Sequence, residues 1–212
     1  MRIIGGIHRS RRLLSPDGDE TTRPITDRVK QALFDKLTSA GLVEEGNALD
    51  IFSGTGSLGL EALSRGSEHC TFVERDYTSR SLLQENISLL RLSDESTVLQ
   101  SDALTMGWLN TVANKPYRIV FCDPPFPLTD EEEGLASVMA LIQLLTPHME
   151  PGGALMMRTR KGIEPPEVEG WGAPLRQEYG SMLVNLYQVP LGESQPDETA
   201  DEDRFEVEDK SE

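Results

Sequence analysis

The stretch LDIFSGTGSLGLEAL, residues 49–63, decides the fold class, because an apolar strand here runs into a glycine loop and then into a helix. Gly54, Gly56 and Gly59 give the loop the spacing G-x-G-x-x-G. Glycines in this pattern let the backbone turn tightly and approach a ligand, with the following helix aimed at it. The stretch therefore predicts a nucleotide-like ligand, and two compete for it: a dinucleotide such as NAD, or S-adenosylmethionine (SAM).

Apolar strand-like runs alternate with helical periodicities along most of the chain. Runs that are apolar along their whole length are typical of parallel strands buried on both faces. The pattern predicts a Rossmann-like α/β fold, a mostly parallel sheet with helices on both faces. Expected strands span residues 47–52, 70–74, 97–101, 118–123 and 152–159, with antiparallel edge strands at 175–179 and 182–189, and expected helices span 26–41, 58–65, 78–90, 103–112 and 130–145.

The two ends of the chain differ from its middle in charge. The chain has 212 residues and a net charge of −16, and residues 191–212 hold ten carboxylates against one Arg and one Lys. A segment with so little to bury is predicted to be a disordered acidic tail. We expect an N-terminal β-hairpin and basic arm at residues 1–25, a single α/β domain at 26–190 and the tail at 191–212.

The first twelve residues hold four arginines and no acid. Arg9, Arg11 and Arg12 are either the solvated face of a hairpin or a contact for a phosphate backbone. Because the rest of the chain is acidic, an approach to nucleic acid needs some cationic surface. Charge alone leaves both interpretations of the three arginines open.

Ligands of such sheets bind beyond the carboxyl ends of the strands, so the residues just after each strand are informative. Asp50 ends the strand before the glycine loop, and its carboxylate suits the ammonium group of SAM better than a pyrophosphate. Glu74 follows the next strand, twenty residues after Gly54, where an acid accepts both hydroxyls of a ribose. Asp102 follows the third strand and is expected either to accept a hydrogen bond from an adenine amine or to cap a helix.

The fourth strand end, VFCDPPFP, selects between the two ligands. The prolines fix the backbone, so the Asp123 side chain and the Pro124 carbonyl become two acceptors in a rigid turn, followed by Pro125 and the aromatic ring of Phe126. Two acceptors suit the two N–H bonds of an amine on a flat ring, on which Phe126 would stack. Two acceptors that bind both protons orient the nitrogen lone pair toward the methyl group of SAM. Hydride transfer does not require such a turn. We therefore predict a class I SAM-dependent amino methyltransferase that needs no metal.

At these residues the chain resembles the RsmD family, bacterial enzymes that methylate N2 of a guanine in 16S ribosomal RNA. The blocks TTRPITDRVKQALFDKL, LDIFSGTGSLGLEALSRG, FVERD, SDAL and DPPF occur in the order and spacing of that family, and the resemblance runs from residue 1 to about 190. TRPITDRVKQALF is the specific block, because many methyltransferases share the glycine loop and the proline turn.

The resemblance implies a role for each matching position and a partner, 16S ribosomal RNA in a small ribosomal subunit or its assembly intermediate. Phe126 stands where the family pattern usually has Tyr, which keeps stacking and removes any role for a hydroxyl. The acidic tail is foreign to the pattern and is expected to weaken attraction to RNA. The implied catalytic residues are Asp123, Pro124, Pro125 and Phe126, the implied SAM contacts are Asp50, Gly54, Gly56, Glu74 and Asp102, and the implied RNA contacts are Arg9, Arg11, Arg12, Arg23 and Arg28.

Four other functions stay open at this point. A protein glutamine methylase would use a similar turn, but normally with Asn as its first residue. A DNA adenine methylase shares the chemistry, but no added domain for reading DNA is visible in the sequence. The third is a non-catalytic RNA-binding assembly factor that kept the fold, and the fourth, favoured least, is a dehydrogenase.

Cys70 and Cys122 lie in apolar runs, with no Cys or His at metal-ligand spacing, and are predicted to be buried reduced thiols. No apolar run approaches the length of a membrane span, and the N-terminus does not have the pattern of a signal peptide. We expect a cytoplasmic monomer that binds SAM, with neither a metal nor a membrane among its partners.

Overall fold

The sheet has the topology that places a ligand site where the strand order reverses. A computed structural model describes residues 1–16, 25–105 and 107–191. The strands are β1 (Asn47–Ile51), β2 (His69–Val73), β3 (Ser96–Leu99), β4 (Tyr117–Cys122), β5 (Met149–Arg160), β6 (Leu175–Tyr179) and β7 (Met182–Gln188). They form one seven-stranded sheet in the order β3-β2-β1-β4-β5-β7-β6, parallel from β3 to β5 and antiparallel at β7 and β6. The order reverses between β1 and β4, so a ligand is expected beyond their carboxyl ends.

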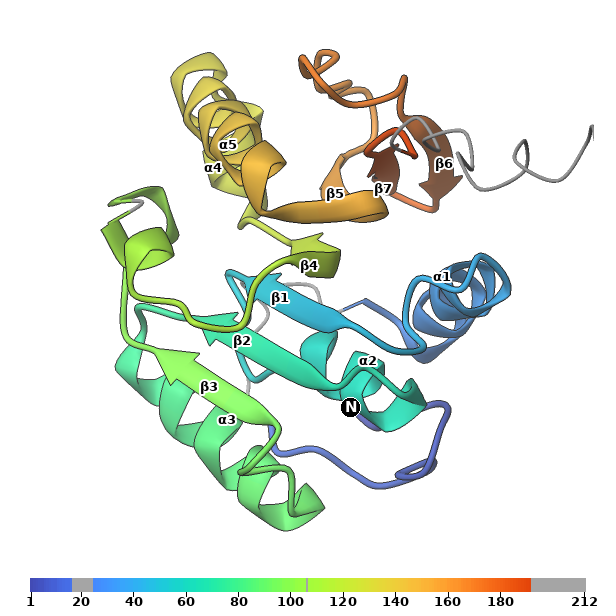
Figure 1. Cartoon of the computed structure of the whole chain (residues 1–212), viewed down its shortest axis with the longest axis vertical. Helices are drawn as coiled ribbons and strands as arrows, with labels where there is room; N and C mark the ends of the chain where they lie inside the picture. The colour runs from blue at the N-terminus through green and yellow to red at the C-terminus, as the bar shows by residue number, and fades with distance from the viewer. Residues whose placement is uncertain (17–24, 106, 192–212) are drawn as a thin grey trace, which may run out of the picture.

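Helices cover both faces of this sheet, as predicted. They are α1 (Asp27–Ser39), α2 (Gly59–Arg65), α3 (Tyr77–Leu90), α4 (Phe126–Asp130) and α5 (Glu132–Leu145). One hydrophobic cluster joins α1, α2 and α3 to one face, and a second joins α5 and the turns after β3 to the other. In Figure 1, α3 runs along β3, while α4 and α5 lie beside β5.

The first helix begins and ends at the signals that its sequence carries. Thr26 caps α1, because its side-chain oxygen accepts the N–H of Val29 at 3.4 Å. The helix ends just before Gly41, whose φ of +65° is the left-handed conformation that glycine adopts most easily. Leu33 and Leu37 are buried, as the predicted apolar stripe requires.

The N-terminal segment folds back on itself, with one antiparallel bridge between Arg2 and Arg12. Across it the N–H of Ile3 donates to the Arg11 carbonyl at 2.9 Å, and the N–H of Leu13 donates to the Met1 carbonyl at 3.1 Å. The N–H groups of Ile4 and Gly5 each donate to the carboxylate of Glu61 at 2.7 Å, so the segment also packs on α2.

Two predicted helices differ in the structure. Residues 103–112 form two 3₁₀ turns, Ala103–Thr105 and Gly107–Asn110, because glycine is a poor helix former and the Asp102 side chain bonds locally to the N–H of Leu104 at 3.0 Å. The helix expected at 130–145 begins at Glu132 instead, after the separate short helix α4.

Both cysteines are buried and reduced. Within the described ranges, no helix is long and apolar enough to cross a membrane. The same residues contain no group of three or more His, Cys, Asp or Glu side chains arranged to hold a metal ion.

Candidate active site

A cavity of about 950 Å³ opens at the carboxyl ends of the parallel strands. Loops after β1, β2, β3 and β4 line it, so the topology brings together the strand ends that the sequence analysis singled out. Its volume is within the range of sites for small molecules and cofactors. The predicted site residues in its lining are Gly54, Glu74, Asp102, Asp123, Pro124, Pro125 and Phe126.

Asp123 is held from two neighbouring strands. Its N–H donates to the carbonyl of Ile51 in β1 at 3.3 Å, and its Oδ1 accepts the Nε–H of Arg158 in β5 at 2.6 Å. Burial raises the pKa of Asp123, and the Arg158 guanidinium opposes that rise. The carboxylate is therefore held in place where the strand order reverses, and 18% of the Asp123 side chain is exposed.

The two prolines set the direction of the chain after Asp123. The Pro125 carbonyl accepts the N–H of Leu128 at 2.9 Å and so belongs to α4, which begins at Phe126. No hydrogen bond reaches the Pro124 carbonyl from any residue that the structure describes. The predicted pair of acceptors, the Asp123 side chain and the Pro124 carbonyl, therefore stands at the cavity wall beside the Phe126 ring.

Glu74 joins the second strand end to the glycine loop. Its Oε2 accepts the N–H of Gly54 and its Oε1 accepts the N–H of Asp76, both at 2.7 Å. Each carboxylate oxygen offers about two acceptor positions, so one on each oxygen remains for a ligand hydroxyl. The two backbone bonds fix the orientation of a group that could accept both hydroxyls of a ribose.

Asp102 has the capping role that the sequence left as one of its two interpretations. Its Oδ1 accepts the N–H of Leu104, and its Oδ2 pairs with Nη1 of Arg75 at 2.9 Å. The Arg75 side chain is 72% exposed, so this ion pair contributes little to stability and can give way to a ligand amine. Capping and ligand binding are therefore compatible at Asp102.

Asp50 lies beneath the glycine loop and outside the cavity lining. Its side chain is fully buried, and its Oδ2 accepts the N–H of Gly59 at 2.8 Å, at the start of α2. Burial raises the pKa of Asp50 well above its ordinary value, and the bond from Gly59 opposes the shift. In this structure the carboxylate orients the helix that follows the loop, and a role toward a ligand ammonium, directly or through water, stays a prediction.

Asp50→Asn is expected to flatten the pH dependence of stability. A folded-state pKa above the unfolded value of about 3.9 means that the folded chain binds more protons, so the free energy of unfolding falls as pH rises between the two values. Asparagine keeps an oxygen for Gly59 and does not titrate. Relative to wild type, the variant should gain about 1.4 kcal/mol toward neutral pH for each unit of raised pKa.

Urea unfolding of wild type and Asp50→Asn between pH 4.5 and 8 measures this difference. Asp76→Asn is the matched control, because hydrogen bonds from Ser79 lower the pKa of Asp76. The whole titration of Asp76 therefore lies below this pH range, and the stability of Asp76→Asn relative to wild type should stay nearly constant from pH 4.5 to 8. Parallel curves for wild type and Asp50→Asn would contradict the assignment.

The first two glycines of the loop have different tasks. Gly56 has a φ of +83°, and a Cβ there would lie 2.4 Å from Cδ1 of Leu83 and 3.2 Å from Cδ1 of Leu60, both buried. Gly54 has a φ of +55° and would meet no atom within 4 Å. Gly54 lines the cavity and Gly56 does not, so Gly56 serves packing and Gly54 faces the ligand.

Alanine at these two positions should therefore separate stability from binding. Gly56→Ala is expected to lower the free energy of unfolding by about 1–3 kcal/mol, because the new methyl group overfills a packed core. Gly54→Ala costs only its backbone strain of about 1–2 kcal/mol and should weaken SAM binding more than Gly56→Ala does. Urea unfolding and calorimetric titration with SAM measure the two effects, and equal losses of affinity would contradict the division.

The predicted RNA-binding arginines that the structure describes lie on two segments, the N-terminal segment and α1. Arg9 lies two residues after Ile7, whose N–H donates to the carbonyl of Ser64 at 2.8 Å in the last turn of α2. That helix starts at the glycine loop and is about 10 Å long, so the Ile7 contact is at the end of α2 that lies away from the loop. Arg12 lies nearer the cavity, because it is bridged to Arg2, next to the cavity-lining Met1.

The other three arginines differ in position as well. Arg11 is exposed on the N-terminal segment. Arg28 is exposed in the first turn of α1, three residues after Ile25, which lines the cavity. Arg23 lies outside the residues that the structure describes.

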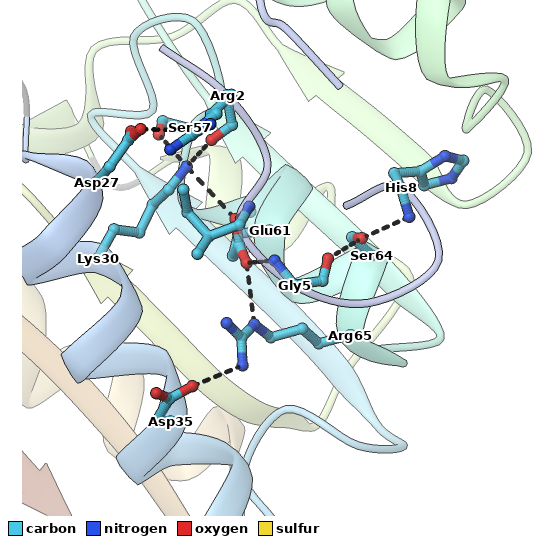
Figure 2. A network of polar contacts seen from close by, with 12 residues as sticks. Arg2, Gly5, His8, Asp27, Lys30, Asp35, Ser57, Glu61, Ser64 and Arg65 are labelled. Carbon is cyan, nitrogen blue, oxygen red and sulfur yellow. Dashed lines mark hydrogen bonds and ion pairs between the residues drawn. The ribbon is translucent and has the colours of Figure 1, made fainter. Parts of the chain in front are cut away.

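A buried ionic network behind the glycine loop was missed in the sequence analysis. Figure 2 shows Glu61 at its centre, fully buried, 3.4 Å from Nζ of Lys30 and 2.9 Å from Nε of Arg65. Lys30 also donates to the Arg2 carbonyl at 2.7 Å and to Oγ of the cavity-lining Ser57 at 3.2 Å. The network therefore ties the N-terminal segment and α1 to the ligand loop.

The sequence held a signal for this network and for one more site residue. Lys30 falls at the helical spacing of Leu33 and Leu37, so it is a cation inside an apolar stripe. Arg158, also missed, stands at the end of an apolar strand, the same kind of position that identified Asp123. A charge inside an otherwise apolar pattern is the common signal.

The charge of the cavity bears on the choice of ligand. Its described lining holds five carboxylates, from Glu74, Asp76, Asp102, Asp123 and Glu131, against two guanidinium groups, from Arg75 and Arg158. An acidic lining favours a cationic ligand, and SAM carries both a sulfonium and an ammonium group. A pyrophosphate would be repelled by the same carboxylates. The residues present therefore fit SAM.

Comparison with known proteins agrees with this geometry. A sequence profile of the family described as conserved hypothetical protein 95 matches residues 1–188. The chain belongs to this family. The match covers the N-terminal segment, the whole sheet and every site residue discussed above, and it confirms the RsmD resemblance.

Family relatives carry methyltransferase names. Ribosomal RNA small subunit methyltransferase D of Haemophilus influenzae is 33% identical over 89% of this chain and 93% of its own. The Escherichia coli K12 protein of the same name is 41% identical over 59% of this chain and 60% of its own. The solved structure of yhhF from Escherichia coli, described as a proposed methyltransferase, is 31% identical, has a TM-score of 0.74 and covers 90% of this chain and 98% of its own.

These similarities decide the enzyme class. The chain has the Rossmann-like fold of a SAM-dependent methyltransferase, it is an enzyme, and its methyl donor is SAM. The prediction of a SAM site over a dinucleotide site is thereby confirmed.

Proposed function

We propose that the protein methylates the exocyclic N2 amine of a guanine in 16S ribosomal RNA of the small subunit. The observation that carries the proposal is the turn after β4. Asp123 and Pro124 place two acceptors beside the Phe126 ring in the same cavity as the glycine loop. The names of the Haemophilus influenzae and Escherichia coli relatives support ribosomal RNA as the substrate.

The residues of the turn supply orientation and electrostatics. SAM, when bound, supplies an electrophilic methyl group on a sulfonium. The Asp123 carboxylate and the Pro124 carbonyl each accept one N–H bond of the amine, and Phe126 stacks on the guanine ring. An aromatic amine is a poor nucleophile because its lone pair is delocalised into the ring. Acceptors on both protons favour a pyramidal nitrogen whose lone pair points out of the ring. As the N–C bond forms, the bond from the methyl group to sulfur would break and leave a neutral thioether, and one amine proton would pass to water.

The cofactor residues divide into contacts and supports. Gly54, Glu74 and Asp102 would contact SAM directly, since they line the cavity. Asp50 and Gly56 would act through the shape of the loop. In this division all five predicted positions serve the cofactor, two of them indirectly.

The RNA would extend beyond the cavity. Arg12 and Arg28 would contact phosphates near the target nucleotide, and Arg9 and Arg11 would contact phosphates farther along the α2 side. Arg23, outside the described residues, stays a predicted RNA contact from the family resemblance. The substrate would be a small ribosomal subunit or its assembly intermediate. The enzyme would act as a monomer in the cytoplasm, without a metal, and the acidic tail would weaken its attraction to RNA.

The proposal is tested by incubating the enzyme with labelled SAM and one of three acceptors, which are unmodified 30S particles, free 16S RNA and ribosomal protein. The labelled nucleoside is then identified by mass. The expected product is N2-methylguanosine in the 30S particle or the free RNA. Label in protein would replace the proposal with a glutamine or other protein methylase, and methyladenine would replace it with an adenine methylase. SAM binding without transfer to any acceptor would favour an assembly factor.

A further inference from the structure

Arg158 contacts both walls of the proposed amine pocket. It lies near the end of β5, and only 8% of its side chain is exposed. Its Nε lies 2.6 Å from Oδ1 of Asp123, and its guanidinium carbon lies 5.1 Å from the centre of the Phe126 ring. One buried cation thus contacts the acceptor that would hold the amine and the ring that would stack on the base.

Arg160 provides an internal comparison. It is two residues farther along β5, on the same side of the strand, and its guanidinium carbon lies 4.9 Å from the centre of the same ring. Its Nη2 pairs with Asp130 at 3.1 Å, and 49% of its side chain is exposed. The two arginines therefore share the contact with Phe126 and differ in the contact with Asp123.

We propose that Arg158 is a positioning residue for methyl transfer, which rests on the proposed function of the turn. The terminal torsion of an aspartate is soft, so an unsupported carboxylate rotates easily. A short charge-assisted bond from a planar guanidinium fixes the carboxylate plane. With Oδ1 bound to Arg158, the amine is received at Oδ2.

The same contact keeps Asp123 able to accept. A protonated carboxyl carries a donor on one oxygen, whereas the amine needs an acceptor. The groups around Asp123 are Arg158 from β5, Asp50 from β1, the thiol of the preceding Cys122, and Glu74 and Glu131 across the cavity. Burial raises the pKa of Asp123 and so favours its protonation, and the guanidinium of Arg158 opposes that rise.

Three variants test the assignment by steady-state kinetics, SAM calorimetry and thermal unfolding of the full chain. Arg158→Met is expected to lower kcat about 10- to 100-fold, the range of a lost charge-assisted hydrogen bond, with the affinity for SAM unchanged within about twofold. Arg158→Lys keeps the charge and should lose less. Arg160→Met, the matched control, removes the contact with the Phe126 ring and the half-exposed pair with Asp130 but no contact with Asp123, and should lower kcat about two- to fivefold.

Two further readouts separate positioning from mere support of the fold. In Arg158→Met the acidic limb of the kcat–pH profile should move to higher pH, because Asp123 then protonates at a higher pH, while Arg158→Lys should keep it near that of wild type. In an Asp123→Asn background, Arg158→Met should cost much less than in wild type, because the two residues act on the same contact.

A carboxyl ¹³C NMR titration makes the inference independent of the RNA substrate. The Asp123 signal, assigned by its absence in Asp123→Asn, should titrate at a higher pH in Arg158→Met than in wild type. An unchanged titration overturns the inference even if the enzyme makes N2-methylguanosine, and so does an equal cost of Arg158→Met in both backgrounds. Failure of the proposed function would instead appear as a labelled product other than N2-methylguanosine from the wild-type enzyme. The rates of the same variants would then be compared for that product.

Discussion

Asp123→Ala is expected to lower kcat for methyl transfer by about 10²–10³-fold, the effect of losing one preorganised group that stabilises a transition state. The carboxylate accepts an N–H bond that strengthens as the nitrogen gains positive charge, so its loss falls on kcat. The affinity for SAM should change little, because Gly54 and Glu74 lie on other loops. Initial rates with labelled SAM and calorimetry with SAM measure the two quantities.

The control for Asp123→Ala is Asp130→Ala, which removes another carboxylate four residues after Phe126. Asp130 pairs with the half-exposed Arg160 at the rim, so its loss should change kcat and stability only slightly. Asp123→Asn keeps one oxygen acceptor and should fall between wild type and Asp123→Ala. A kcat within tenfold of wild type for Asp123→Ala, in a folded protein, would exclude Asp123 as the group that holds the amine.

Glu61→Ala is expected to lower the free energy of unfolding by about 3–5 kcal/mol, the cost of leaving buried charges without their partner. The Glu61 carboxylate accepts from the N–H groups of Ile4 and Gly5 and pairs with Lys30 and Arg65 (Figure 2). Burial lowers the pKa of Lys30, and Glu61 opposes that shift. Without Glu61, the pKa of Lys30 should therefore fall further. In alkaline solution the Lys30 side chain is then neutral, so the loss of stability should be smaller there.

The matched control for Glu61→Ala is Glu178→Ala. Glu178 pairs with Lys161 at 2.6 Å, a shorter distance than either pair of Glu61, but both side chains are more than half exposed. An exposed pair contributes about 0–1 kcal/mol, so the control should be close to wild type in urea unfolding. Equal losses for Glu61→Ala and Glu178→Ala would mean that burial does not decide the strength of these contacts.

The sequence by itself determined the sheet and the composition of the catalytic turn, because both depend on local patterns. Apolar runs bounded by polar residues gave strand positions to within two residues for four of the five parallel strands, with β5 starting three residues before the expected run. Parallel strands end at a common edge, so Glu74, Asp102 and Asp123 could be predicted to share a site before any distance was known.

Tertiary structure alone decided which groups serve the ligand and which serve the fold. Asp50 and Gly56 belong to the same short motif as Gly54, yet only Gly54 faces the cavity, because α2 and α3 pack against the loop from behind. The N-terminal segment is attached to α2 by Glu61, about 57 residues away in the sequence, which accepts the N–H groups of Ile4 and Gly5.

Long-range pairing also decided the partner of the proposed catalytic carboxylate, Asp123. The sequence places Arg158 thirty-five residues after Asp123, and no local pattern links the two. They meet because β5 lies beside β4 in the sheet, with Cys122 opposite Met157 in the parallel register. Local periodicity determines where strands lie, and only the register between strands determines which charge faces which.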